Sequence, residues 1–146
     1  MSPRAASRPS TRDLGLLVLR IAVGGTLIAH GLQKLLVYTL PRVTQSFAGM
    51  GVPAAEIVAP AVATIELVGG ALIVAGVGTR IAGLFAAAAM LGAVFTAHLS
   101  AGFFAADGGF ELPLLLACAA VALALTGPGR LSLHAALLRG RLPLAA

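Results

Sequence analysis

The sequence has few charged residues and few aromatic residues. Of its 146 residues, 10% are Asp, Glu, Lys or Arg and 5% are aromatic, with no tryptophan. Soluble globular domains carry about 25% charged residues, so this chain lacks the polar surface needed to cover a water-soluble core. The shortage of charge excludes an ordinary soluble enzyme. The chain is instead 59% hydrophobic, with a mean hydropathy of +1.01.

Several motifs of soluble enzymes are also missing. A single cysteine, Cys118, excludes an intrachain disulfide and a thiol pair for redox chemistry. The sequence contains no phosphate-binding Gly loop after a strand and no nucleophile elbow. The net charge is +5, but the basic residues do not alternate with aromatic residues along a stripe, so no nucleic-acid surface is predicted.

Four long apolar runs contain most of the hydrophobic residues; they cover residues 14–37, 58–77, 81–99 and 110–126. At 1.5 Å per residue, each run can cross or nearly cross the ~30 Å hydrocarbon layer as a helix. Backbone groups in lipid must be paired internally, and strand-like alternation is absent, so helices are favoured over a barrel. The sequence therefore predicts an all-α membrane protein, with a bundle of four transmembrane helices over residues 14–135.

Three segments outside these runs complete the predicted organisation. Residues 1–13, rich in Ser, Pro and Arg, are expected to form a disordered cytoplasmic tail, and residues 136–146 a second cytoplasmic tail. Between the first and second spans, Val43, Phe47 and Met50 recur at helical spacing. This spacing indicates either a short helix, lying in the outer membrane interface or capping the bundle, or an irregular loop.

Positive charges are distributed unevenly between the two sides of this four-span arrangement. Arg42 is the one basic residue that lies clearly in a loop on one side. The arginines of the other side are Arg4, Arg8, Arg12, Arg80, Arg130, Arg139 and Arg141. Since Lys and Arg accumulate in cytoplasmic loops, we expect both termini to be cytoplasmic.

Glu66 lies near the middle of the second apolar run, where a carboxylate is costly unless another group compensates it. Candidate partners in the other runs are Arg20, His30, Lys34, His98 and Glu111. His30 and Glu66 are the first expected pair, because the helical rise places both roughly 10–12 Å below the outer surface. The residues expected nearer that surface, as a second cluster, are Lys34, His98 and Glu111.

Small residues share helix faces with these polar groups. Gly24 and Gly31 lie beside the polar arc of the first run, and Gly69 and Gly70 lie beside Glu66 in the second. Small residues let helix backbones approach closely. We therefore expect these faces to pack against other helices rather than lipid.

Structural explanations compete with functional ones. Lys34 can extend to the membrane surface, and Arg20 can either do the same or reach Glu66 from the cytoplasmic side. Glu111 suits the dipole of a helix start, and His98 suits the interface. Glu66 leaves two interpretations of similar weight, a structural ion pair or a functional carboxylate. The His-x-x-x-His and Glu-x-x-His spacings of helical metal sites do not occur, so no metal is predicted.

Short motifs follow one another in a characteristic order over residues 14–133. They occupy residues 19–21, 29–34, 49–53, 65–70, 78–80, 102–104, 109–113 and 127–133, together with Met90 and His98. In this order the motifs resemble those of the DoxX-like family of small four-helix bacterial membrane proteins. His134 departs from the family pattern, which often has Asp at this position.

The resemblance implies a multi-pass protein of the bacterial inner membrane. DoxX-like proteins include small subunits associated with thiosulfate:quinone oxidoreductase, and members linked to thiol and oxidative-stress systems alongside soluble enzymes. It therefore implies a membrane subunit or anchor in quinone-linked redox or oxidative-stress metabolism. Beyond the bilayer itself, the expected partners are further copies of the chain or a soluble redox enzyme, and the expected ligand is a membrane quinone.

Under this hypothesis, His30 and Glu66 exchange protons beside a pocket in the outer leaflet. The supporting polar residues are Arg20, Lys34, His98 and Glu111. If the chain takes part in catalysis, it does so at most as the membrane subunit of an oxidoreductase complex. Two alternatives stay open: a non-catalytic scaffold that recruits a soluble redox enzyme, and an oligomeric small-molecule or proton-coupled transporter.

Overall fold

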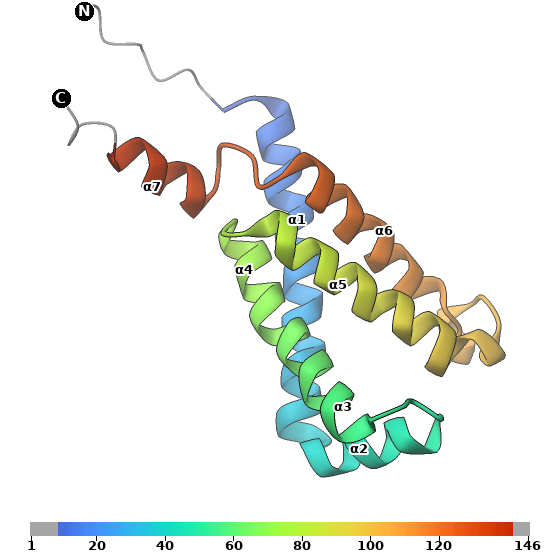
Figure 1. Ribbon diagram of the computed structural model, residues 1–146. Helices are drawn as coiled ribbons and strands as arrows, with labels where there is room; N and C mark the ends of the chain where they lie inside the picture. The colour runs from blue at the N-terminus through green and yellow to red at the C-terminus, as the bar shows by residue number, and fades with distance from the viewer. Residues whose placement is uncertain (1–8, 142–146) are drawn as a thin grey trace, which may run out of the picture.

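The computed structural model describes residues 9–141, and every regular element in that range is a helix (Figure 1). Three helical segments are long and apolar enough to cross a membrane: Thr11–Val37, Ala55–Ala75 and Thr79–Ala101. The fourth apolar helix, Glu111–Thr126, has 16 residues and is about 24 Å long, shorter than the ~30 Å hydrocarbon layer. The all-helical prediction is confirmed, and length alone identifies three of the four predicted spans.

Each long segment combines α-helix with one turn of π-helix. The segments consist of α1 (Thr11–Leu32) with η1 (Gln33–Val37), α3 (Ala55–Thr64) with η2 (Ile65–Gly69) and α4 (Gly70–Ala75), and α5 (Thr79–Ala93) with η3 (Val94–His98) and the short η4 (Leu99–Ala101). The remaining described elements are α2 (Leu40–Gly49), η5 (Ala105–Asp107), α6 (Glu111–Thr126) and α7 (Leu133–Arg141).

The first helix begins earlier than the sequence analysis expects, because Ser10 and Asp13 form a capping box at its start. The Asp13 carboxylate accepts hydrogen bonds from the backbone N–H of Ser10 and, across the bundle, from the backbone N–H of Arg130, both at 2.9 Å. Asp13 therefore joins the start of α1 to the connection between α6 and α7.

The observed ends of α1 and α7 shorten the two tails that the sequence analysis predicts. Residues 11–13 are helical, and residues 136–141 belong to α7. Residues 1–8 and 142–146 of the two predicted tails lie outside the described residues.

The helices form two closely packed pairs, α1 with η2 and α4, and α5 with α6 (Figure 1). Gly24 and Gly70 face each other in the first pair, where a Cβ atom on Gly24 would lie 2.6 Å from the Gly70 carbonyl oxygen. In the second pair, a Cβ atom on Gly83 would lie 2.8 Å from the Ala120 carbonyl oxygen. The prediction that the faces with Gly24 and Gly70 pack against other helices is confirmed, and the structure adds that the two glycines face each other.

Arg20 holds the end of the bundle where α1 begins and where α4 and α6 end, here called the Arg20 end. Its side chain is buried and donates hydrogen bonds to the carbonyl oxygens of Ile73 (3.0 Å), Val74 (2.8 Å), Pro128 (2.6 Å) and Leu131 (2.7 Å). Helix C-termini leave carbonyl groups without intrahelical partners. Arg20 therefore satisfies the end of α4 and the chain after α6 with one guanidinium group.

The two helix pairs diverge toward the opposite end, here called the Lys34 end (Figure 1). The connection there forms the helix α2, with Pro41 in its first turn and Val43 buried, and α2 packs against α3. The connection is therefore helical rather than irregular, and its expected place in the membrane interface stays a prediction.

Candidate functional site

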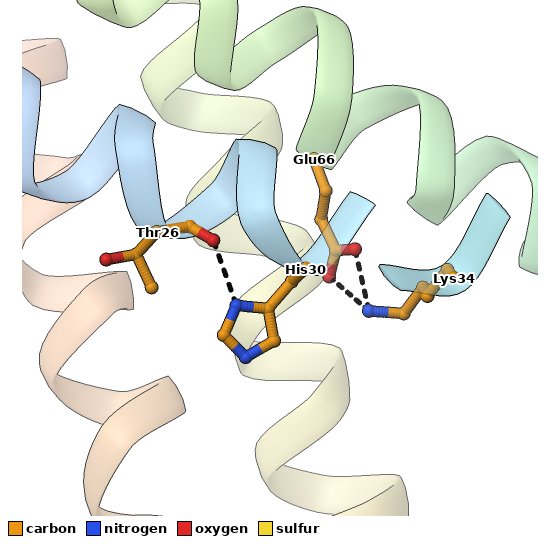
Figure 2. A network of polar contacts seen from close by, with 4 residues as sticks. All are labelled: Thr26, His30, Lys34 and Glu66. Carbon is orange, nitrogen blue, oxygen red and sulfur yellow. Dashed lines mark hydrogen bonds and ion pairs between the residues drawn. The ribbon is translucent and has the colours of Figure 1, made fainter. Parts of the chain in front are cut away.

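An ion pair between Lys34 and Glu66 lies at the centre of the Lys34 end. The Lys34 ammonium donates hydrogen bonds to both Glu66 carboxylate oxygens, with Nζ to Oε1 at 2.7 Å and Nζ to Oε2 at 2.6 Å (Figure 2). The Glu66 side chain is 3% exposed and the Lys34 side chain 18% exposed. The negative charge of Glu66 is thus compensated, and Lys34 is the more exposed partner of the pair.

The expected first pairing of Glu66 with His30 is replaced by the pairing with Lys34. The depth argument treated the first span as a continuous α-helix, but Lys34 lies in the π turn η1 and Glu66 in the π turn η2. A π turn contains one more residue than an α turn, so it rotates the residues that follow. His30 lies close beside the pair in Figure 2.

All three long segments place a polar residue of this region in a π turn. Lys34 is in η1, Glu66 in η2 and His98 in η3. π turns are rare and occur frequently at functional sites. This coincidence marks the Lys34 end as the candidate site.

The two histidines each turn one ring nitrogen toward a backbone carbonyl. His30 Nδ1 lies 2.9 Å from the Thr26 carbonyl oxygen (Figure 2), and His98 Nδ1 lies 2.7 Å from the Gly108 carbonyl oxygen. A carbonyl can only accept, so we assign the hydrogen to Nδ1 in both rings. Each neutral ring then keeps Nε2 as a proton acceptor.

These side chains surround a cavity between the two helix pairs, here called the central cavity. Its volume is about 220 Å³, and its polar lining includes His30, Lys34, Glu66 and His98. The rest of the wall comes from the loop before α6, through Ala105, Gly108 and Gly109, and from apolar side chains of α1, α5 and α6: Leu27, Met90, Ala93, Leu112, Pro113 and Leu116. The space is therefore mainly apolar, with a few polar groups that come from both helix pairs.

A second, larger cavity of about 610 Å³ continues from this site to the surface beneath α2, and is here called the outer cavity. It shares His30, Lys34, His98 and Gly108 with the central cavity. Its other polar lining residues are Gln33, Tyr38, Arg42 and Ser46. The outer cavity connects the ion pair to the end of the molecule where α2 lies.

Four of the six predicted site residues meet at this site: His30, Lys34, Glu66 and His98. Arg20 lies at the opposite end, where it neither pairs with Glu66 nor extends to headgroups but binds backbone carbonyls. Glu111 lies at the start of α6, and its carboxylate accepts a hydrogen bond from the Ala105 backbone N–H at 2.9 Å. Glu111 thereby fixes the loop that carries η5.

The sequence analysis did not identify Tyr38 and Arg42 as residues of the site, nor Asp13 as a tertiary contact. The Ser10-x-x-Asp13 spacing of a capping box was a readable signal for Asp13. For Tyr38 and Arg42 the sequence carries no comparable signal, because the position of α2 over the site depends on tertiary packing.

Comparison with known proteins gives two matches. The family model described as DoxX matches residues 15–99. A protein of Bacillus subtilis (strain 168) named "Putative oxidoreductase CatD" is 35% identical over 129 residues, which cover 88% of this chain and 91% of the relative. No solved structure matches the chain significantly.

Proposed function

The chain belongs to the DoxX family, and from this premise and the polar cavity at its Lys34 end we propose that it is a quinone-binding membrane subunit of a redox complex. The observation that carries the proposal is the Lys34–Glu66 pair, which lines the mainly apolar central cavity and whose Lys34 also lines the outer cavity. The printed name of the Bacillus relative is that of an oxidoreductase, which supports the redox assignment.

The proposed topology has four spans, with α6 as the short fourth one. A helix of about 24 Å crosses a ~30 Å layer when the bilayer thins locally around it. The Arg20 end carries Arg12, Arg80 and Arg130 on its helix ends and connections, and the Lys34 end carries Arg42 beside α2. By the positive-inside rule, both termini are cytoplasmic, and α2 lies at the outer surface of the bacterial inner membrane.

A quinone ring suits the central cavity in shape and in polarity. Ligand sites are typically apolar pockets with a small number of convergent polar groups. Lys34 has three N–H groups, of which two bind Glu66. The third is free to donate to a quinone oxygen, and within the described residues no other ammonium group faces this cavity.

Proton transfer is the chemistry that the chain itself would supply. Reducing a quinone to a quinol takes two electrons and two protons. Glu66 and the Nε2 atoms of His30 and His98 can pass those protons between the quinone oxygens and water in the outer cavity. The electrons come from a soluble oxidoreductase partner, because the chain has no thiol pair of its own.

A scaffold without catalytic function is the second candidate, and the closed geometry of the ion pair favours it. A buried pair with both carboxylate oxygens satisfied is also what a purely structural contact needs. In that case the polar residues fix helix packing, and the cavity binds no quinone.

Quinone binding can be measured through Tyr38, which is the only tyrosine in a chain without tryptophan and which lines the outer cavity. A quinone headgroup analogue without a tail is titrated against the protein in lipid vesicles, and quenching of tyrosine emission is recorded. We expect saturable quenching, and Lys34→Met should weaken the affinity about tenfold or more, because a charged hydrogen bond contributes ~1.5–3 kcal/mol.

Two further variants control this experiment. Arg12→Met, at the Arg20 end, should leave the affinity unchanged. Lys34→Met/Glu66→Leu removes both charges, so no unpaired charge destabilises the fold, and it should also bind weakly. Saturable binding that both Lys34 variants retain would overturn the assigned site, and the absence of binding to the wild type would favour the scaffold.

A further inference from the structure

A groove between the α3–η2–α4 segment and α5 is made of two neighbouring hollows, which share no lining residue and of which one is also lined by Phe47 and Met50 of α2. It has two parts, here together called the lipid-side groove. The part toward the Lys34 end has a volume of about 280 Å³ and is lined by residues that include Val58, Val62, Ala88 and Gly92. The part toward the Arg20 end, of about 450 Å³, is lined by residues that include Val68, Leu72, Ile81 and Phe85.

The groove contrasts with the close contacts within each of the two helix pairs. The α1–α4 and α5–α6 contacts leave no space for a Cβ atom at Gly24 or Gly83. Gly92, on the groove side of α5, has no atom within 4 Å of an added Cβ.

The groove is continuous with the candidate site. Its first part shares Lys34, Glu66, Ala93 and His98 with the lining of the central cavity. The helical part of the α3–η2–α4 segment from Glu66 to Ala75, along which the second part lies, spans nine residues, or about 14 Å. Apolar hollows thus follow the helix from the ion pair toward the Arg20 end.

We propose that the lipid-side groove is the access path from lipid, here called the doorway, for the isoprenoid tail of the quinone, whose ring lies beside Lys34 and Glu66. This inference rests on the proposed function. Two observations select a tail as the occupant: continuity with a site that holds the ring, and the absence of any charged residue from the lining of the second part. The site then has two entrances, one from lipid for the substrate and one through the outer cavity for water and protons.

The groove acts through shape rather than through affinity. A tail that moves from lipid into an apolar groove gains little hydrophobic free energy, because lipid chains are as apolar as Leu. Its effect is to let the ring enter while the tail remains outside the bundle. Filling the groove should therefore exclude tailed quinones, whereas a tail-less analogue still enters through the outer cavity.

Gly92→Phe tests this doorway, because the new side chain projects into the groove from a position with free space. Gly25→Phe is the matched control, since Gly25 is an exposed α1 glycine that also has no atom within 4 Å of an added Cβ. Both proteins are titrated in vesicles with a tailed quinone and with the tail-less analogue, and Tyr38 emission is recorded. We expect Gly92→Phe to weaken binding of the tailed quinone about tenfold and to leave the analogue unaffected.

The outcomes separate the two proposals. If neither quinone binds the wild type, the proposed function fails together with this inference. If Gly92→Phe binds both quinones as the wild type does, or weakens both equally, the quinone site stands and the doorway is wrong. A wild-type dimer that Gly92→Phe converts to a monomer would assign the groove to a second copy of the chain instead.

Discussion

Two basic residues in the membrane region are stabilised in different ways. Lys34 is paired with a carboxylate and retains an N–H group for a ligand, whereas Arg20 is bound on several sides by backbone carbonyls. The planar guanidinium presents five N–H donors in a fixed arrangement, which an ammonium cannot reproduce. Arg20 is therefore a structural residue, because its N–H donors bind backbone carbonyl oxygens of the fold.

Arg20→Lys tests this difference at the residue scale. The substitution keeps the charge but cannot satisfy the carbonyls of α4 and of the chain after α6 together, so we expect a loss of about 2 kcal/mol in the free energy of unfolding. Thermal unfolding in mild detergent measures the effect. Arg12→Lys, at an exposed position, should leave the unfolding midpoint unchanged, and an equal effect of both variants would contradict the structural role of Arg20.

At the scale of the helices, close glycine contacts and π turns have complementary effects. The contacts between Gly24 and Gly70 fix how near α1 and α4 lie. The π turns η1 and η2, on the same two segments, then set which side chains meet. The Lys34–Glu66 pair depends on both features.

Gly24→Ala should disturb the contact between α1 and α4. The added methyl group would lie 2.6 Å from the Gly70 carbonyl oxygen, and overpacking of this kind costs ~1–3 kcal/mol. The neighbouring Gly25→Ala adds a methyl group in open space and should be neutral or stabilising, because Ala has the higher helix propensity. Calorimetry of the two variants in detergent measures the difference, and similar midpoints would argue against the packing described.

At the scale of the whole molecule, both described ends of the chain lie at the Arg20 end of the bundle (Figure 1). Together with the distribution of arginines, this arrangement gives a topology that can be tested. In a Cys118→Ala background, Ala48→Cys lies on α2 and Ala136→Cys on α7, both exposed. We expect a membrane-impermeant maleimide to label Ala48→Cys in intact cells and Ala136→Cys only after the cells are opened. The reverse pattern would invert the topology, and labelling of both from outside would rule out an even number of spans.

The sequence predicted the helices well because hydropathy and glycine position are local properties. The spacing of Val43, Phe47 and Met50 offered a helix beside an irregular loop for the first connection. The small size of Gly24 and Gly70 indicated that their faces pack against helices, but not that these two residues meet. The partner of Glu66 could not be predicted in the same way. Depth along a uniform α-helix favoured His30. No residue pattern in the sequence predicts the π turns, in which Lys34 and Glu66 lie.

The central claim is that Glu66 exchanges protons with a bound quinone. The most direct measurement is an infrared difference spectrum of the protein in vesicles, recorded while bound tail-less quinone is reduced at an electrode. We predict a carboxyl band that is lost in Glu66→Gln and retained in Glu56→Gln, a change at an exposed glutamate in the first turn of α3. A carboxyl region that is identical in the wild type and in Glu66→Gln would contradict the account.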